Sequence, residues 1–366
     1  MKKLERIIIS GGGTGGHIFP AIAIANEIKL QFPDAEILFV GAEGKMEMEK
    51  VPAAGYSIVG LPIAGLQRKL TFSNFLLPFK LVNSLMKARK VIRSFNPQVV
   101  IGVGGYASGP TLQMANQLRI PSVIQEQNSF PGKTNLWLAK RAAKICVAYE
   151  GMDRFFPKEK IVLTGNPVRS EVIQIDGLRD EALAYFNLSN DKKTVLIIGG
   201  SLGAKTLNDA LEANLNQLVA HNIQVIWQCG KFYADTLQAR IGSKLPKGVW
   251  LNPFIMEMNK AYAAADIIVS RAGAISVSEL CLIGKPVLLV PSPNVAEDHQ
   301  TKNAMALVDK QAAILVKDSE AREQLIHKII DLAGDETKQH EISSAIKQLA
   351  KANATKDIVR EILKVI

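Results

Sequence analysis

The sequence has few cysteines, and their spacing excludes the common metal and redox motifs. The 366 residues include three cysteines, which lie far apart in apolar surroundings, at Cys146, Cys229 and Cys281. Zinc sites and dithiol redox centres need cysteines only a few positions apart. We therefore expect three buried thiols in a reducing compartment.

Long apolar runs are also missing. No uninterrupted apolar stretch reaches the roughly 20 residues that a membrane-spanning helix needs. The run Ile7-Ile8-Ile9 follows a basic start, but it is too short for the core of a signal peptide and passes into glycines. Any contact with a membrane should therefore be peripheral.

Acidic residues are absent from one long segment. Between Val51 and Gln125 there is no aspartate or glutamate. The basic residues of this segment are Arg68, Lys69, Lys80, Lys87, Arg89, Lys90, Arg93 and Arg119. The formal net charge of the whole chain is +10, which indicates an anionic partner such as nucleotide phosphates, nucleic acid or an acidic membrane surface.

Aromatic residues follow a helical spacing inside this basic segment. Phe72, Phe75, Leu76 and Phe79 lie beside lysines, and Pro78 should either kink or start a helix there. An apolar patch surrounded by cations is typical of a protein that lies on an anionic leaflet. An ordinary surface helix gives the same pattern. Nucleic acid is not favoured, because the sequence has neither a platform of stacking aromatic residues nor a recognition helix.

Apolar runs alternate with longer helical patterns along the whole chain, which predicts parallel strands joined by crossover helices. A chain of this length exceeds one ordinary core, so we expect two α/β domains, 1–165 and 166–349, with the break where a strand ends in a Gly-Asn-Pro turn. The amphipathic helix at about 350–366 should pack back on the first domain. The expected strands are RIIIS, AEILFVG, QVVIGVGG, PSVIQEQ and KICVAY, then KTVLIIGG, IQVIWQCG, ADIIVS and KPVLLVP.

Two glycine loops follow strands, one in each half. In SGGGTGGHIFPA, residues 10–21, the glycines allow close approach to a ligand, and a helix that starts there points free N–H groups and its positive dipole end at an anion. A tight turn for packing alone is the alternative. A second alternative is a dinucleotide dehydrogenase in which Glu43 binds the ribose. That interpretation does not explain the second glycine loop, GGSLGA at 199–204. A pyrophosphate held in a cleft between the domains would use both loops.

Several polar residues beside these loops are candidates for chemistry. His17 lies at a helix N-terminus, where its neutral form is favoured, so it can be a general base, a cap or a phosphate contact. Glu279 either accepts hydrogen bonds from a ribose diol or complements a helix dipole. No Asp-x-Asp pair occurs, which argues against a carboxylate-held metal ion, so loop N–H groups and helix dipoles should stabilise the leaving group.

Seven motifs in order resemble the MurG family of bacterial glycosyltransferases: GGTGGHIFPA, GVGGYASGP, QEQNSFPGKTN, TGNPVRSEV, GGSLGA, SRAGAISVSEL and EDHQTKNA. The resemblance implies a GT-B fold, in which two Rossmann-like, doubly wound parallel-sheet domains face an inter-domain cleft. It implies inverting, metal-independent and cofactor-free transfer of N-acetylglucosamine from UDP-N-acetylglucosamine to lipid I, forming lipid II for the cell wall. It also implies peripheral binding to the anionic cytoplasmic face of the membrane, close to other cell-wall synthesis proteins.

The resemblance also assigns residues. His17 or Glu126 would take the proton, Thr14, Gly15 and Gly16 would touch the donor diphosphate or sugar, and Tyr106 would lie exposed at the acceptor pyrophosphate. The remaining contacts to the donor would come from Asn128, Arg169, Ser201, the Ile255 backbone, the turn Ala274, Ile275, Ser276, Val277, Ser278 and Glu279, and Gln300.

Two positions depart from the family pattern. Gln125 stands where a histidine often precedes Glu-Gln-Asn, which weakens a catalytic imidazole there, and Thr301 stands where a second glutamine can follow Gln300. A UDP-N-acetylglucosamine 2-epimerase of the same fold is the nearest alternative enzyme. A module that binds the nucleotide sugar without turning it over is the alternative that is not an enzyme.

Overall fold

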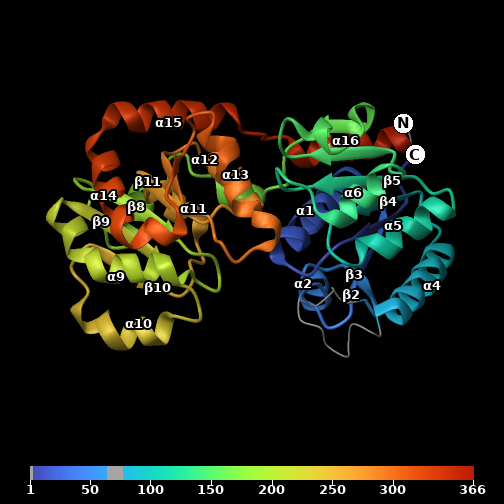
Figure 1. Cartoon of the computed structure of the whole chain (residues 1–366), viewed down its shortest axis with the longest axis horizontal. Coiled ribbons are helices and arrows are strands. Elements are labelled where there is room, and N and C mark those ends of the chain that lie inside the picture. Colours follow the sequence, from blue (N-terminus) through green and yellow to red (C-terminus); the bar gives the residue numbers. More distant parts are fainter. Residues whose placement is uncertain (1–2, 64–76) are drawn as a thin grey trace. The chain divides into compact units, whose positions relative to one another are not determined.

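The computed structural model describes residues 3–63 and 77–366, and its contacts divide the chain into two compact units (Figure 1). The first unit is Met1–Val168 together with Lys351–Ile366, and the second is Arg169–Ala350. Each unit has its own parallel sheet and hydrophobic core.

The first unit is built on a seven-stranded sheet in the order β3-β2-β1-β4-β5-β6-β7, with every pairing parallel. Because β1 lies between β2 and β4, the strand order reverses there, and loops that follow strands at such a switch point form binding crevices in open α/β sheets. Both glycine-rich loops of this unit, after β1 and after β4, lie at this point. The strands are β1 (Arg6–Ser10), β2 (Glu36–Ala42), β3 (Ser57–Leu61), β4 (Val99–Gly102), β5 (Ser122–Glu126), β6 (Lys144–Val147) and β7 (Ile161–Leu163).

Helices cover both faces of this sheet because successive strand residues point to opposite sides. Ile7 and Ile9 of β1 are buried with the helices α1 and α16, whereas Ile8 is buried with α4, α5 and α6. The C-terminal helix α16 packs against α1 in this unit. The helices are α1 (Gly15–Gln31), α2 (Glu47–Ala53), α4 (Leu77–Phe95), α5 (Ser108–Gln117), α6 (Lys133–Ala139) and α16 (Ala354–Val365).

The second unit repeats the design with a six-stranded parallel sheet in the order β10-β9-β8-β11-β12-β13, whose switch point lies between β8 and β11. The strands are β8 (Lys193–Ile198), β9 (Ile223–Gln228), β10 (Val249–Asn252), β11 (Ile267–Ser270), β12 (Val287–Leu289) and β13 (Ile314–Leu315). The helices are α7 (Ser170–Ile173), α8 (Arg179–Tyr185), α9 (Lys205–Ala220), α10 (Ala234–Ile241), α11 (Met258–Ala264), α12 (Ala274–Ile283), α13 (His299–Val308), α14 (Ala321–Gly334) and α15 (Glu336–Gln348).

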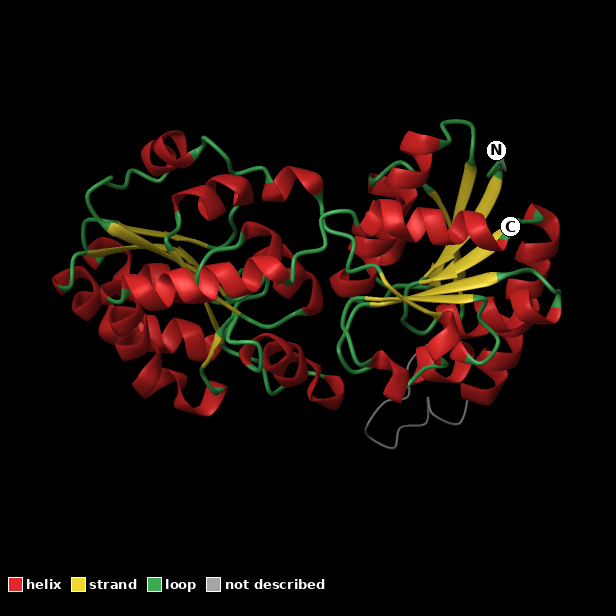
Figure 2. Ribbon diagram, turned by 90° about the horizontal axis from the view of Figure 1, so that it is seen from above, coloured by secondary structure: helices red, strands yellow, loops and turns green. Residues whose placement is uncertain are grey.

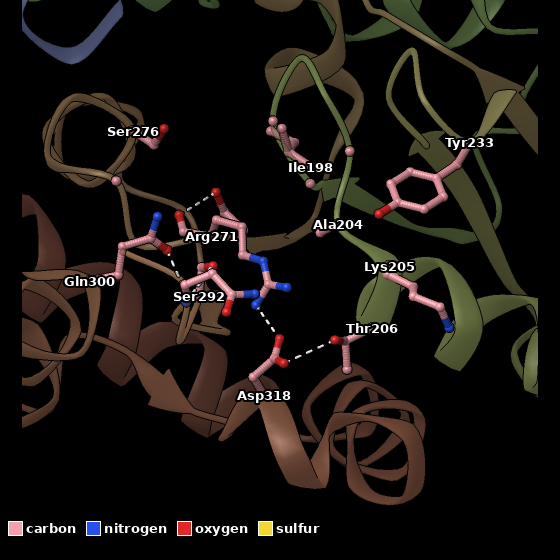
Figure 3. A pocket seen from close by; sticks show the side chains of 16 residues that line it. Ile198, Ala204, Lys205, Thr206, Tyr233, Arg271, Ser276, Ser292, Gln300 and Asp318 are labelled. Carbon is pink, nitrogen blue, oxygen red and sulfur yellow. Dashed lines mark hydrogen bonds and ion pairs between the residues drawn. The ribbon is translucent and has the colours of Figure 1, made fainter. Parts of the chain in front are cut away.

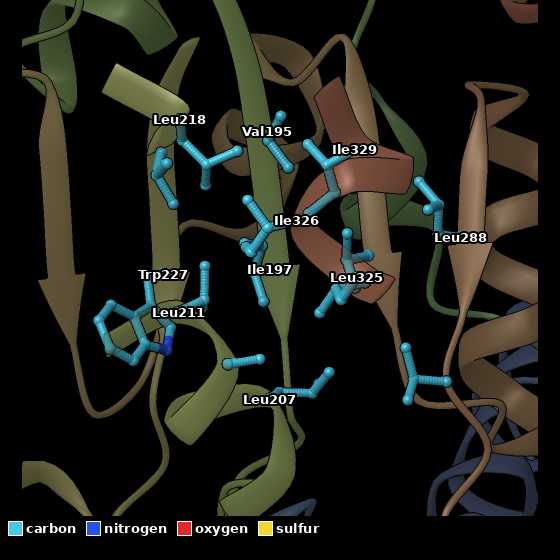
Figure 4. Packing of buried hydrophobic residues seen from close by; sticks show 14 of the residues in the cluster. Val195, Ile197, Leu207, Leu211, Leu218, Trp227, Leu288, Leu325, Ile326 and Ile329 are labelled. Carbon is cyan, nitrogen blue, oxygen red and sulfur yellow. The ribbon is translucent and has the colours of Figure 1, made fainter. Parts of the chain in front are cut away.

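Apolar side chains of α9 and α14 form the core on one face of this sheet (Figure 4). Leu211 of α9 and Ile326 of α14 pack over Val195 and Ile197 of β8. Trp227 is fully buried in the same cluster, and its indole N–H donates to Asn208 Oδ1 at 2.9 Å, so the buried donor is satisfied.

The predicted fold class is confirmed: each sheet is parallel and has helices on both sides (Figure 2). The predicted burial of the cysteines is confirmed as well, since all three are buried thiols. Burial raises the pKa of Cys146 and of Cys281 to about 12, so these thiols are poor nucleophiles at neutral pH.

Candidate functional site

The loop after β1 brings a histidine and two glycines with positive φ together. Gly12 and Gly13 have φ of 149° and 87°, values that L side chains rarely adopt. Thr14 is the extended N-cap of α1, and its carbonyl accepts the N–H groups of His17 and Ile18. The chain therefore turns sharply from the sheet into the helix and sets His17 in the first turn.

The His17 imidazole is oriented by the loop itself. Its Nδ1 lies 3.1 Å from the Gly12 carbonyl oxygen and 3.3 Å from Thr14 Oγ1. A carbonyl oxygen can only accept, so the neutral ring carries its proton on Nδ1 and has its lone pair on Nε2. This is the tautomer that a general base acting through Nε2 requires.

The glycine loop after β4 lies directly against the first. A Cβ on Gly104 would fall 2.9 Å from His17 Nε2, and a Cβ on Gly105 would fall 2.3 Å from the Gly12 oxygen. Only glycine allows this approach. We call Gly12, Gly13, His17, Gly104 and Gly105 the glycine-loop centre.

Side chains from neighbouring elements fix the second loop. Ser108 Oγ lies 2.7 Å from the Ser10 carbonyl and 2.9 Å from the Gly104 carbonyl. Gln127 Nε2 donates to the Val103 carbonyl at 2.8 Å. Tyr106 is exposed at this loop, which leaves its ring accessible to a ligand.

Glu126, at the end of β5, is buried and bound by four donors. Its Oε1 accepts from Asn128 N at 3.0 Å and from Asn128 Nδ2 at 3.3 Å, and its Oε2 accepts from Gly132 N at 3.2 Å and Asn135 Nδ2 at 2.8 Å. Burial raises the pKa of Glu126, and these hydrogen bonds lower it in part. Both oxygens hold the loop 127–132, so the geometry favours His17 over Glu126 as the group that takes a proton.

Gln125 is part of a buried amide network rather than an open site. Its Nε2 donates to Asn166 Oδ1 at 2.9 Å, and Asn166 Nδ2 donates to the Gln127 carbonyl at 3.0 Å. A neutral amide thus supports the segment that precedes the Glu126 loop.

The second unit has a pocket of about 370 Å³ at its switch point (Figure 3). It opens between the loop after β8 and the start of α12, so backbone N–H groups from a glycine loop and a helix N-terminus border it. The lining residues are Ile198, Gly199, Gly200, Gly203, Ala204, Lys205, Thr206, Tyr233, Ser270, Arg271, Gly273, Ser276, Ser292, Asn294, Gln300 and Asp318.

Gln300 is held at the pocket by its amide oxygen. Oε1 accepts from Ser292 N at 2.9 Å and from Ala272 N at 3.2 Å, which leaves the amide nitrogen to donate to a ligand. The hydroxyl of the neighbouring Thr301 instead donates to Asp298 Oδ1 at 2.7 Å.

An ion pair between Arg271 and Asp318, which was not predicted from the sequence, lies in the lining of the pocket. Arg271 donates to the Val290 carbonyl at 2.9 Å, to the Pro291 carbonyl at 3.2 Å and to Asp318. Asp318 also accepts from Thr206 Oγ1 at 2.9 Å (Figure 3). The Arg in SRAG was visible in the sequence, but Asp318 lies 47 residues away and carries no local signal.

Glu279, one turn inside α12, is mostly buried and does not line this pocket. Tyr262 Oη donates to its Oε2 at 3.2 Å. Burial raises the pKa of Glu279, while the charge of Arg169 and the Tyr262 hydroxyl lower it. The backbone N–H of Ile255 is already bound to Gln228 Oε1 at 3.1 Å.

The remaining predicted residues divide by exposure. Ser276 lines the pocket, Ser201 lies exposed in the β8 loop, and Val277 is buried in the core, so only its backbone could meet a ligand. Ser278 Oγ bonds to the Ala274 carbonyl at 3.1 Å within α12. Ile275 in the first turn of α12 and Gly15 and Gly16 in the first turn of α1 are at helix N-termini, as predicted from the glycine loops.

The helix α4 presents an apolar stripe on the first unit. It begins at Leu77, so Pro78 lies in its first turn rather than at a kink. Phe79, Val82 and Met86 are 75%, 54% and 62% exposed and recur at helical spacing. Exposed basic residues on the same helix are Arg89, Lys90 and Arg93. Phe72, Phe75, Leu76, Arg68 and Lys69 lie outside the described residues.

The part of the chain that the structure describes has neither a metal-binding group of side chains nor a membrane-spanning helix. In residues 3–63 and 77–366, no three histidine, cysteine, aspartate or glutamate side chains are grouped so that they could hold a metal ion. Across the same two ranges, no helix is long and apolar enough to cross a membrane.

Comparison with known proteins shows the family. The N-terminal domain model of glycosyltransferase family 28 matches residues 7–147, and the C-terminal domain model of that family matches residues 194–361. A curated relative from Flavobacterium psychrophilum, named UDP-N-acetylglucosamine–N-acetylmuramyl-(pentapeptide) pyrophosphoryl-undecaprenol N-acetylglucosamine transferase, is 56% identical over 99% of this chain and 98% of its own. The chain belongs to the MurG family of glycosyltransferases.

Solved structures agree with this assignment. The crystal structure of MurG from Acinetobacter baumannii has a TM-score of 0.80 and 31% identity, covering 98% of this chain and 99% of that one. A UDP-GlcNAc 2-epimerase from Neisseria meningitidis, bound to UDP-GlcNAc, covers 99% of this chain and 100% of that one, with a TM-score of 0.66 and 16% identity. At that identity the likeness to the epimerase shows the fold alone. The family models and the names of the curated relatives make the chain a glycosyltransferase.

Proposed function

We propose that this protein transfers N-acetylglucosamine from UDP-N-acetylglucosamine to the C4 hydroxyl of the muramoyl sugar of lipid I and so forms lipid II. One observation carries the proposal: a histidine oriented as a base lies between two glycine loops, in a chain of the MurG family. The reaction inverts the anomeric carbon, because the hydroxyl attacks opposite the departing UDP.

The second-unit pocket is the proposed donor site. N–H groups of the β8 loop with Ser201 and of the first turn of α12 would meet the diphosphate, as glycine loops and helix N-termini do for anions. The Gln300 amide nitrogen would donate to the sugar. Glu279 would accept from a ribose bound beside the pocket, because Glu279 does not line the pocket itself. The Ile255 backbone would meet the uracil, which requires that Ile255 N–H exchange its bond to Gln228.

The glycine-loop centre is the proposed acceptor site. His17 Nε2 takes the proton of the C4 hydroxyl as its oxygen bonds to the anomeric carbon and the bond to UDP breaks. Tyr106 and the second glycine loop would meet the acceptor pyrophosphate, and Thr14 and Asn128 would contact the transferred sugar. Arg169 would offset charge on the donor phosphate.

A direct assay tests the reaction and separates it from its rivals. Incubation with labelled UDP-N-acetylglucosamine should release UDP only when a lipid I analogue is present, and chelators should leave the rate unchanged. A 2-epimerase would convert the sugar without acceptor, and a binding module would convert nothing. Either of those results, or a rate abolished by chelation, would contradict the proposal.

The α4 stripe is the proposed membrane contact, on the cytoplasmic face where lipid I presents its sugar. Exposed Phe79, Val82 and Met86 would enter the acyl boundary while Arg89, Lys90 and Arg93 meet anionic headgroups. Each cation near such a surface adds about 1 kcal/mol.

Replacing both Phe79 and Met86 with serine should weaken binding to anionic vesicles at least about tenfold, because burial of two large apolar side chains is lost. Co-sedimentation with vesicles of phosphatidylglycerol and phosphatidylcholine measures this. Leu30→Ser, at an exposed apolar position on α1 of the same unit, is the matched control. Unchanged binding of the double variant, or binding of the native protein that ignores salt, would remove α4 from this role.

A further inference from the structure

One peptide bond in the first glycine loop joins a buried carboxylate to the proposed base. The Gly12–Gly13 peptide donates its N–H to Glu47 Oε2 at 2.8 Å, and its carbonyl oxygen lies 3.1 Å from His17 Nδ1. The order of contacts is therefore carboxylate, peptide, imidazole. Neither the motifs nor the resemblance assigned any role to Glu47.

Glu47 is fixed in this position. It opens α2, is 1% exposed, and its other oxygen accepts from Ala42 N at 2.9 Å. A Cβ on Gly12 would fall 2.2 Å from Glu47 Cδ, and a Cβ on Gly41 would fall 2.5 Å from Glu47 Cγ. Gly12, in the loop after β1, and Gly41, in β2, therefore leave the space that the Glu47 side chain fills, and a side chain at either position would clash with it.

We infer that Glu47 is a positioning residue for the transfer reaction, acting through the Gly12–Gly13 peptide to hold His17 in the Nδ1–H tautomer and to stabilise its protonated form. The inference rests on the proposed function, in which His17 takes the acceptor proton. The proton moves from the C4 hydroxyl to Nε2 and later leaves to solvent, and Glu47 takes no part in that transfer.

The physical reason is polarisation of the shared peptide. A hydrogen bond from an N–H to a carboxylate is charge-assisted and stronger than a neutral one, and bonds in such a chain strengthen one another. The Gly12 oxygen therefore becomes a better acceptor for Nδ1–H, most of all when the ring is an imidazolium. In Ser-His-Asp triads a carboxylate does this by direct contact with Nδ1. In this protein the carboxylate acts across one peptide bond.

The alternative is that Glu47 only braces the loop, and two further measurements on Glu47→Gln distinguish the two roles. The variant keeps the side-chain shape, removes the charge and turns an NH₂ group toward one of the two backbone donors, Gly13 N–H or Ala42 N–H. We expect kcat to fall about 10- to 100-fold, the range for loss of a hydrogen bond to a charged group, with the KM for UDP-N-acetylglucosamine unchanged. Glu49→Gln, an exposed carboxylate on the same helix, should keep the native rate.

Two further measurements separate positioning from bracing. In a His17→Ala background, Glu47→Gln should add less than about twofold, because groups that act as a unit are not additive. Long-range ¹H–¹⁵N correlation spectra, with the His17 signal identified by its loss in His17→Ala, should show the Nδ1–H tautomer in the native protein and a mixture in Glu47→Gln. The native spectrum is informative even if the variant fails to fold.

The outcomes also separate this inference from the proposed function. If His17→Ala keeps a near-native rate, the role of His17 as base is wrong. If His17→Ala is impaired but Glu47→Gln lowers the rate equally in both backgrounds, or the native ring carries its proton on Nε2, then Glu47 is a brace and the inference alone is overturned.

Discussion

Replacing His17 with alanine should lower kcat for N-acetylglucosamine transfer by at least about a hundredfold, the effect of losing a general base. The imidazole contacts both glycine loops of the first unit, and its Nδ1 is held by the Gly12 carbonyl. Alanine removes the lone pair that would receive the C4 proton, and it removes no part of the second-unit pocket. The affinity for UDP should therefore stay within about twofold.

Initial rates with a lipid I analogue and calorimetric titration with UDP measure these two quantities. His221→Ala is the matched control, because that imidazole also has its Nδ1 on a backbone carbonyl, at 2.8 Å from Gln217 O, but is exposed at the end of α9. A His17 variant that turns over at near the native rate would exclude this residue as the base. Equal loss in the control would point to a general effect of removing an imidazole.

The central strands could be predicted from the sequence because they are buried on both faces. All residues of β4, β5, β9 and β11 are buried, and short apolar runs, such as VVIG in β4 and IIV in β11, indicate them in the sequence. The strands β3, β10 and β13 were not predicted. They lie at sheet edges, where side chains are only partly buried and an apolar run is not required.

The glycine loops could be predicted as well, since each follows a buried run and precedes a helix. Their partners could not. GAEGKMEMEK contains Glu43, Glu47 and Glu49, and nothing in its spacing says which of them is buried. Glu43 would bind ribose only in the dehydrogenase alternative. In the structure Glu43 pairs with Lys87 at the surface, whereas Glu47 binds the loop. Tertiary contact alone makes this distinction.

The contacts of Glu126 could not be predicted from the sequence either. The family resemblance suggested Glu126 as an alternative to His17 for taking the proton, and Glu126 is the last residue of the buried strand β5. The sequence could not show that four donors from positions 128, 132 and 135 would fold back on it. A carboxylate satisfied in this way organises a loop, and its replacement should act through that loop.

Glu126→Gln should lower turnover about a hundredfold while leaving UDP affinity within about twofold. The amide keeps the shape of the side chain but presents an NH₂ group to donors that need an acceptor, and each unsatisfied buried donor costs about 1–3 kcal/mol. The loop that carries Asn128 should then leave its position in the first unit. Glu159→Gln, an exposed carboxylate of the same unit, is the matched control and should keep the native rate.

Hydrogen exchange decides how Glu126 acts. The amides of Asn128 and Gly132 both donate to its carboxylate, so they should lose protection in Glu126→Gln if its role is to hold the loop. If these amides stay protected from exchange while turnover is impaired, Glu126 contacts the substrate directly, as a base or through a substrate hydroxyl. Glu126 would then be a catalytic candidate together with His17. A native rate with lost protection would mean that the loop 127–132 takes no part in transfer.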